Sequence, residues 1–129
     1  MKIIPKKNHV IGRVVIKRAL SAIVRPDETK ETTKFVLIDA VGPGAAAQGL
    51  KVGDVILPTK MSIIKFDGGV LVRPMVHADD FAAVMEGVTL AELAVQTDPG
   101  TEYVPIDSER AAKSFAESPV SEPRGAVAA

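Results

Sequence analysis

The chain contains no cysteine, and this absence removes several kinds of chemistry at once. Without thiols there can be no disulfide, no cysteine nucleophile, no iron–sulfur cluster and no cysteine-type zinc site. Aromatic residues are also scarce, with four Phe, one Tyr and no Trp among 129 residues. This scarcity disfavours proteins that bind single-stranded nucleic acid by stacking its bases on aromatic side chains.

Long apolar runs and an excess of one charge are missing as well. No segment approaches the roughly 18 consecutive apolar residues that a membrane span requires, and the first seven residues lack the apolar segment of a secretory signal. Sixteen Lys and Arg balance sixteen Asp and Glu. The chain therefore lacks the basic footprint of a nucleic-acid-binding protein. We expect a soluble, cytoplasmic protein without nucleic-acid or membrane partners.

The residues that are present indicate one compact domain. Hydrophobic residues make up 47% of the chain, which is ordinary for a globular protein. The charges are unevenly distributed, because residues 1–60 carry a net charge of +6 and residues 61–129 a net charge of −6. Complementary halves can pair within one subunit or between neighbouring copies, and a chance division of one folded surface explains the same numbers.

Short apolar runs rich in β-branched residues predict a small all-β barrel or sandwich. The runs lie between Pro and Gly turn signals, at residues 10–16, 35–41, 52–57, 63–66 and 70–72. Residues 19–34 are mainly polar and predict a long exposed loop. Residues 79–86 predict a capped helical turn or a short closing segment, because Asp is a favoured N-cap before an apolar run.

The character of the chain changes after about residue 87, so we expect a body at 1–86 and a C-terminal extension at 87–129. The larger apolar residues here, Val88, Leu90, Leu93 and Val95, are too few for a second core. Residues 108–118 predict one short helix with Ser108 as N-cap and Glu109 and Lys113 as an i,i+4 pair. The last eleven residues bury little and predict disorder or an extended arm.

Catalytic and metal-binding patterns are weak. His9 and His77 are the only histidines, and no G-x-S-x-G nucleophile elbow or phosphate-binding glycine loop occurs. His77 with Asp79 and Asp80 could offer metal ligands, but the spacing matches no closed site and a cap explains the two Asp. We therefore expect no catalytic residues, no metal, no cofactor and no enzymatic activity.

A series of short motifs, in order across residues 1–86, resembles the GroES co-chaperonin family. The motifs lie at residues 1–5, 14–18, 21–27, 41–44, 51–57, 64–68 and 79–84. The resemblance implies a small irregular β-barrel without catalytic residues, which forms rings and caps a chaperonin chamber. From the residues themselves, Gly42 and Gly44 around Pro43 predict a sharp turn with positive φ. Asp54 is expected to bind backbone amides in a tight turn that begins at Lys51.

The chain departs from the GroES pattern where that family docks on its partner. The family's mobile loop carries a glycine pair and three apolar residues, whereas this chain has Ser21, Ala22, Ile23, Val24 and Arg25. A guanidinium is unfavourable in an apolar groove, although its long stem can leave the head in water. The partner-binding candidates are these five residues, together with Phe115 and Val120 of the extension.

The sequence leaves three functions open. The first is a non-enzymatic structural protein that uses a GroES-like barrel to bind and stabilise a larger assembly, such as a capsid decoration or cement subunit. The second is a co-chaperonin lid that docks through Ile23 and Val24. A minor third is a PDZ-like peptide-binding module, since residues 41–57 resemble that family's turn and strand, although the long helix such domains need is missing after it. The expected partners are other protein subunits, in a capsid-like shell or a chaperonin ring, and further copies in a homo-oligomer. The expected location is the cytoplasm during assembly, with the virion as a second place.

Overall fold

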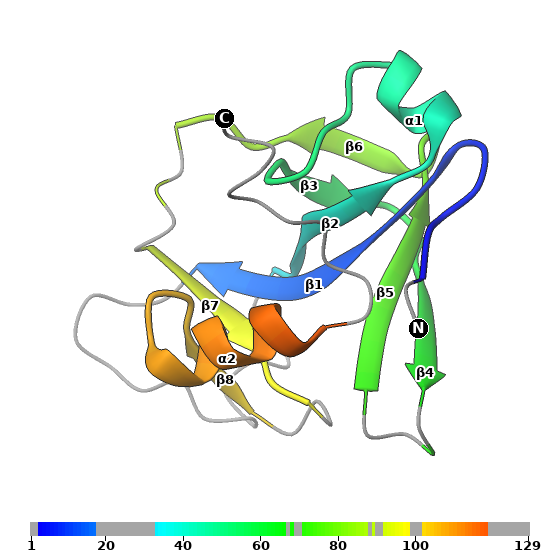
Figure 1. Ribbon diagram of the computed structural model, residues 1–129. Helices are drawn as coiled ribbons and strands as arrows, with labels where there is room; N and C mark the ends of the chain where they lie inside the picture. Colours follow the sequence, from blue (N-terminus) through cyan, green and yellow to red (C-terminus); the bar gives the residue numbers. More distant parts are fainter. Residues whose placement is uncertain are drawn as a thin grey trace, which may run out of the picture.

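The computed structural model describes residues 3–17, 33–66, 68, 71–87, 89, 92–98 and 102–118 (Figure 1). This part of the chain forms eight strands and two short helices. In order they are β1 (His9–Lys17), β2 (Phe35–Val41), α1 (Pro43–Ala47), β3 (Val55–Pro58), β4 (Ser62–Phe66), β5 (Leu71–His77), β6 (Phe81–Val84), β7 (Leu93–Gln96), β8 (Tyr103–Pro105) and α2 (Glu109–Glu117). The prediction of a small all-β fold with a short C-terminal helix is confirmed.

All strand pairs are antiparallel and belong to one sheet, in the order β4-β5-β1-β2-β3-β6, with β7 paired to β1 and β8 paired to β7. Among the described residues no pairing joins β4 to β6, so the sheet is strongly curved in Figure 1 but is not closed by hydrogen bonds.

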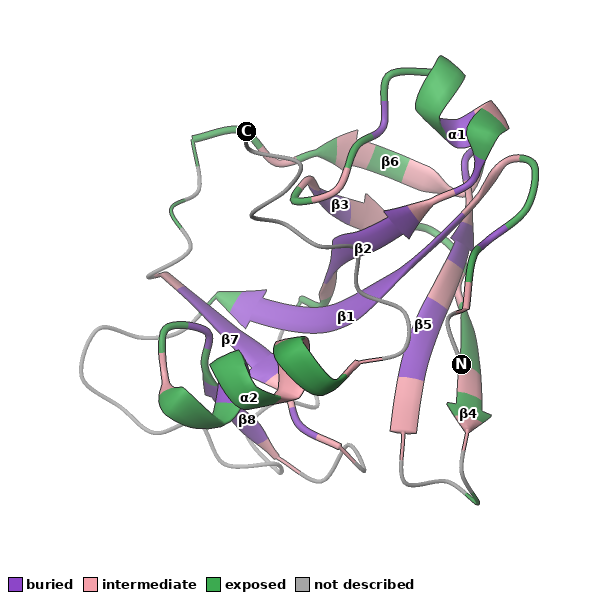
Figure 2. Cartoon of the chain, in the orientation of Figure 1, coloured by how far each residue is buried: buried purple, intermediate pink, exposed green. Residues whose placement is uncertain are grey.

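Strand β1 is the centre of this sheet. One of its edges pairs with β2, while the other is divided between β5, at residues 9–11, and β7, at residues 15–17. Residues 10–16 are all buried, because both faces of the strand are covered. Figure 2 shows buried residues along β1, β2 and β7, whereas exposed ones lie on the outer sides of α1 and α2. A strand buried on both faces is mainly apolar, as residues 10–16 are apart from Gly12 and Arg13.

The core consists of two main clusters on opposite faces of β2. Consecutive residues of a strand point to opposite faces. Accordingly, Val36 belongs to the first cluster, with Val10, Ile38, Ile56 and Val76, and Leu37 belongs to the second. The second cluster also contains Val15, Val55, Leu93, Val95, Val104, Ile106 and Ala111. It therefore combines residues from both sides of position 87.

The turn after β2 differs from its prediction. Gly42 has φ −74° and caps a five-residue helix, α1, that begins at Pro43. The predicted positive φ at Gly42 and Gly44 is therefore wrong. The glycines are required by close packing instead. A Cβ on Gly42 would lie 2.5 Å from the carbonyl oxygen of Lys7, and one on Gly44 would lie 2.0 Å from Oδ1 of Asn8.

The structure tests two further predictions, at the turn before β3 and at residues 79–86. The Asp54 carboxylate accepts a hydrogen bond from the Lys51 amide at 3.2 Å, and Gly53 has φ +96°, so the predicted tight turn is confirmed. Residues 81–84 form β6, which agrees with a short closing segment and not with a helical turn. Pairing with β3 places these residues in the sheet, since a tertiary contact overrides the local helix signal of the preceding Asp pair.

The extension contains one predicted and two unpredicted elements. Helix α2 begins after Ser108, whose Oγ accepts a hydrogen bond from the Ala111 amide, as the capping signal predicted. Strands β7 and β8 were not predicted, since the sequence suggested only a helix and an arm here. They form because the second half of β1 has a free edge with which β7 pairs.

Candidate functional site

Of the seven partner-binding candidates chosen from the sequence, six lie outside the described residues: Ser21, Ala22, Ile23, Val24, Arg25 and Val120. Phe115 is described, and its ring packs against the second core cluster of its own chain. The Arg13 guanidinium lies over this ring, with Cζ 4.8 Å from the ring centroid. The structure thus places Phe115 at the junction between α2 and the sheet.

This junction holds an unusual group of buried charges. Arg13 on β1, Asp39 on β2 and Arg73 on β5 are at most 1% exposed. Burying an ion costs several kcal/mol unless it is paired and hydrogen-bonded. Their partners therefore define what this region does.

The Arg73 guanidinium is paired with the carboxylate of Asp98, which follows β7. Nη1 donates to Oδ1 at 2.5 Å and Nη2 donates to Oδ2 at 3.2 Å, which is a bidentate arrangement. The Val72 amide of β5 also donates to Oδ1, at 3.2 Å. Asp98 thus accepts a hydrogen bond from the part of β5 that is not paired with β1. One side chain links β5 to the β7–β8 hairpin.

These contacts also set the charge of Asp98. Burial alone would raise the pKa of this carboxyl, but the hydrogen bond and the positive charge of Arg73, the Val72 amide and the charge of Arg13 together lower the pKa below its ordinary value of 3.8. Asp98 is therefore ionised at neutral pH.

Arg13 reaches the last turn of α2. Nη1 donates to Ser114 Oγ at 2.6 Å, Nη2 donates to the Ser114 carbonyl oxygen at 2.9 Å, and Nε lies 3.4 Å from Oδ2 of Asp39. Arg73 Nη2 donates to Ser118 Oγ, just beyond the helix, at 3.3 Å. The last carbonyls of a helix lack partners within it and carry partial negative charge, so cations stabilise this end.

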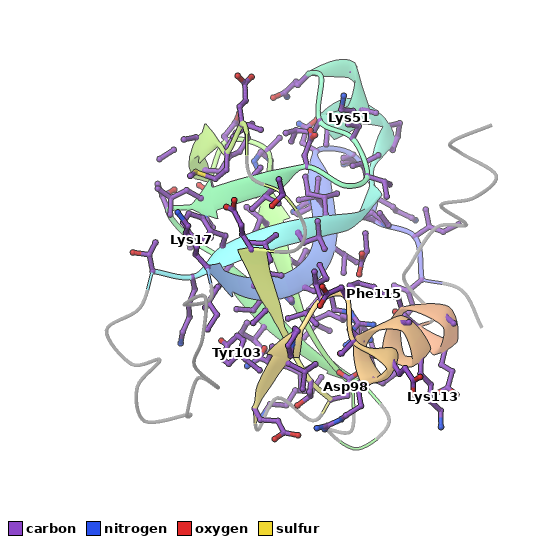
Figure 3. All side chains as sticks on the ribbon, turned by 90° about the vertical axis from the view of Figure 1, so that its left-hand side faces the viewer. Lys17, Lys51, Asp98, Tyr103, Lys113 and Phe115 are labelled. Carbon is purple, nitrogen blue, oxygen red and sulfur yellow. The ribbon has the colours of Figure 1, made fainter. Side chains whose placement is uncertain are left out.

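We call this group, Arg13, Asp39, Arg73, Asp98, Ser114 and Ser118, the buried clamp. Figure 3 shows Phe115 and Asp98 at the junction of α2 with the strands and Lys113 on the outer side of the helix. A cavity of about 400 Å³ opens beside the clamp, between α2 and strands β5, β7 and β8.

The chemistry of the clamp is structural. Ser114 Oγ lies 3.4 Å from Asp98 Oδ2, but a carboxylate with a lowered pKa is a weak base and does not activate a hydroxyl. Within the part of the chain that the structure describes, no three His, Cys, Asp or Glu side chains gather as a metal site.

The sequence contained a signal for the clamp that motif searching missed. Arg13, Asp39 and Arg73 each interrupt an apolar strand with a single charge. A lone charge at a core position indicates a buried partner or a functional site.

Comparison with known proteins adds no relative. No protein-family model matches the chain, and no curated protein matches it. The described residues include no helix of sufficient length and apolarity to span a membrane.

Proposed function

We propose that this protein is a non-enzymatic structural protein that binds other protein subunits and stabilises a larger assembly, in the manner of a capsid decoration or cement subunit. The observation that carries this proposal is the outer edge of β6. This strand pairs only with β3 among the described residues. No described strand pairs with its other edge, and a strand from another subunit can add to the backbone groups there.

The β6 edge differs from the other two edges of the sheet. Native proteins protect exposed edges with charges, proline or very short strands. Lys65 lies on β4, and β8 is three residues long and ends at Pro105. β6 reads Phe-Ala-Ala-Val and carries neither a charge nor a proline, and Val84 is 40% exposed. Such an edge can accept a strand from a partner.

The charges beside β6 suggest that one such partner is a second copy of this chain. Asp79 and Asp80 precede the strand and Glu86 follows it. Near the N-terminus the exposed Ile4 is followed by Lys6 and Lys7. An apolar segment flanked by lysines complements an apolar strand flanked by acids. This supports a homo-oligomer, which then presents several copies of α2 to a larger assembly.

The alternative function is a co-chaperonin lid. The GroES-like motifs favour it, since a small all-β fold is what that resemblance implies. The departures at Ser21, Ala22 and Arg25 disfavour it, because they lie in the segment that would dock. A PDZ-like module is the weakest alternative, since residues 62–66 and 71–77 form strands where that fold needs its long helix.

The oligomeric state tests the carrying observation. Light scattering after size-exclusion chromatography should give an oligomer for the native protein and a monomer for Val84→Lys, which puts a charge on the β6 edge. Ile63→Lys places the same charge on the β4 edge and should leave the oligomer intact. A native monomer at high concentration, or an oligomer that survives Val84→Lys, would contradict the β6 interface.

A second experiment separates the two functions. The purified protein is mixed with a chaperonin, nucleotide and a denatured substrate. Nucleotide-dependent complex formation would reject the shell function, and stoichiometric recovery of the protein from purified particles would reject the lid function.

A further inference from the structure

The two histidines of the chain come together on the sheet, next to Asp79 and Asp80 at the start of β6. His9 on β1 and His77 on β5 are directly opposite each other in the antiparallel register. Their rings meet edge to face, with centroids 5.1 Å apart. Opposite residues on one face have Cβ atoms about 4.5–5.5 Å apart, so two imidazoles at such positions can reach one ion.

The hydrogen bond of His9 prepares its other ring nitrogen for a metal. Nδ1 lies 3.2 Å from the Lys6 carbonyl oxygen. A carbonyl oxygen only accepts, so Nδ1 carries the proton and Nε2 has a free lone pair. Metal-binding histidines almost always donate their second ring N–H to such an oxygen.

His77 has a second oxygen behind its ring. Nδ1 accepts a hydrogen bond from the Asp79 amide at 3.1 Å and lies 3.6 Å from Asp79 Oδ2. In this arrangement the ring proton is on Nε2. Binding of a metal through Nε2 therefore requires this proton to move to Nδ1, next to Asp79 Oδ2, and the hydrogen bond from the Asp79 amide to be given up.

The space next to the two rings contains soft donors. A hollow of about 250 Å³ is lined by His9 and His77 together with Met61, Met75 and Asp80, and by Lys60 and Ser62. Met75 lies two residues before His77 on β5 and so shares its face. Lys60 is exposed and can keep its ammonium in water.

We propose that His9, His77 and Met75 form a binding site for a soft monovalent metal ion, Cu⁺. Imidazole suits copper and zinc alike, but a thioether selects Cu⁺. Zinc in structural sites takes four ligands from Cys, His and carboxylates, and no three such side chains among the described residues are placed so that they could hold one ion together. Two nitrogens and one thioether therefore match Cu⁺ and leave Zn²⁺ without a complete ligand set.

The test uses Ag⁺ as a redox-inert stand-in for Cu⁺, followed by NMR of the imidazole protons and methionine methyl groups of the full chain. We expect the signals of His9, His77 and Met75 to shift and to saturate at one equivalent. Competition for Cu⁺ between the protein and a Cu⁺-specific chelator, under reducing conditions that keep the copper monovalent, then gives the affinity. His77→Gln should abolish binding, and Asp79→Asn, which removes the negative charge behind His77, should weaken it about 10-fold.

Matched variants distinguish this site from adventitious binding. Met75→Leu should weaken Ag⁺ and Cu⁺ binding while leaving the amide spectrum native, and Met85→Leu, which changes a thioether in the second core cluster, should have no effect. The proposal is overturned if Ag⁺ shifts neither histidine, if Met75→Leu binds as tightly as the native chain, or if Zn²⁺ competes with Ag⁺ on equal terms.

Discussion

Replacing Asp98 by alanine should reveal how much the buried clamp contributes to stability. The substitution removes both hydrogen bonds that the fully buried Arg73 guanidinium donates to Asp98, and also the acceptor of the Val72 amide. Among the described residues, the Val72 carbonyl and Ser118 Oγ remain as partners of Arg73. Removing one partner of a buried ion pair costs about 3–5 kcal/mol. Asp98 is 16% exposed, so water can partly replace it, and we expect about 3 kcal/mol.

Urea unfolding at pH 7 measures this loss. With a slope of about 2 kcal/mol per molar urea, a loss of about 3 kcal/mol lowers the midpoint by about 1.5 M. The matched control is Glu102→Ala, which breaks the exposed pair between Arg110 and Glu102. Exposed pairs contribute less than about 1 kcal/mol, so the control midpoint should shift by less than about 0.5 M.

The double variant Arg73→Met/Asp98→Ala separates pairing from packing. An apolar side chain of similar length removes the unpaired charge, so the double variant should be more stable than Asp98→Ala alone. Equal losses for Asp98→Ala and Glu102→Ala would refute the reasoning. The reasoning would also be refuted if the loss of the double variant equalled the sum of the losses of Arg73→Met and Asp98→Ala, because the two charges would then not interact.

Two further predictions follow from the same contacts. Because the pKa of Asp98 is lowered in the folded protein, its contribution to stability is complete above the unfolded pKa of about 3.9 and is lost as the pH falls through the lower folded value. Urea unfolding from pH 6 to pH 2 should therefore show a smaller loss of stability in acid for Asp98→Asn than for the native chain. Equal losses would contradict the assignment. Gly12→Ala should destabilise the sheet by more than about 2 kcal/mol, because its Cβ would lie 2.0 Å from the Leu37 carbonyl oxygen at the irregular register between β1 and β2. The control Gly49→Ala has open space around its Cβ but φ +93°, and should cost only about 1 kcal/mol in the same assay. Similar losses for both variants would contradict the clash.

The strands of the body could be predicted because each carries its own signal. β1 and β2 are mainly apolar runs between turn residues, which is typical of strands that are buried on both faces. Helix α2 was predictable for the same reason, since Ser108 caps it through a contact only three residues away. These elements depend on neighbours in the sequence, which a sequence reveals.

The remaining elements depend on distant contacts. β7 and β8 are four and three residues long, too short for a periodic pattern, and exist because β1 offers an edge. The clamp is similar, since Arg13 and Ser114 are 101 residues apart. The lone charge in β1 shows that a partner is needed. It does not show that the partner is the last turn of a helix.

The contacts also explain why the change of composition near residue 87 does not divide the packing. β7 continues the sheet along the half of β1 that β5 leaves, and Asp98 accepts from the amide of β5 where the two strands diverge. Arg13 and Arg73, from two different body strands, then hold the end of α2. Buried guanidinium groups therefore connect α2 to β1 and β5. Under the proposed function, a partner bound to α2 would be attached to the sheet through these hydrogen bonds.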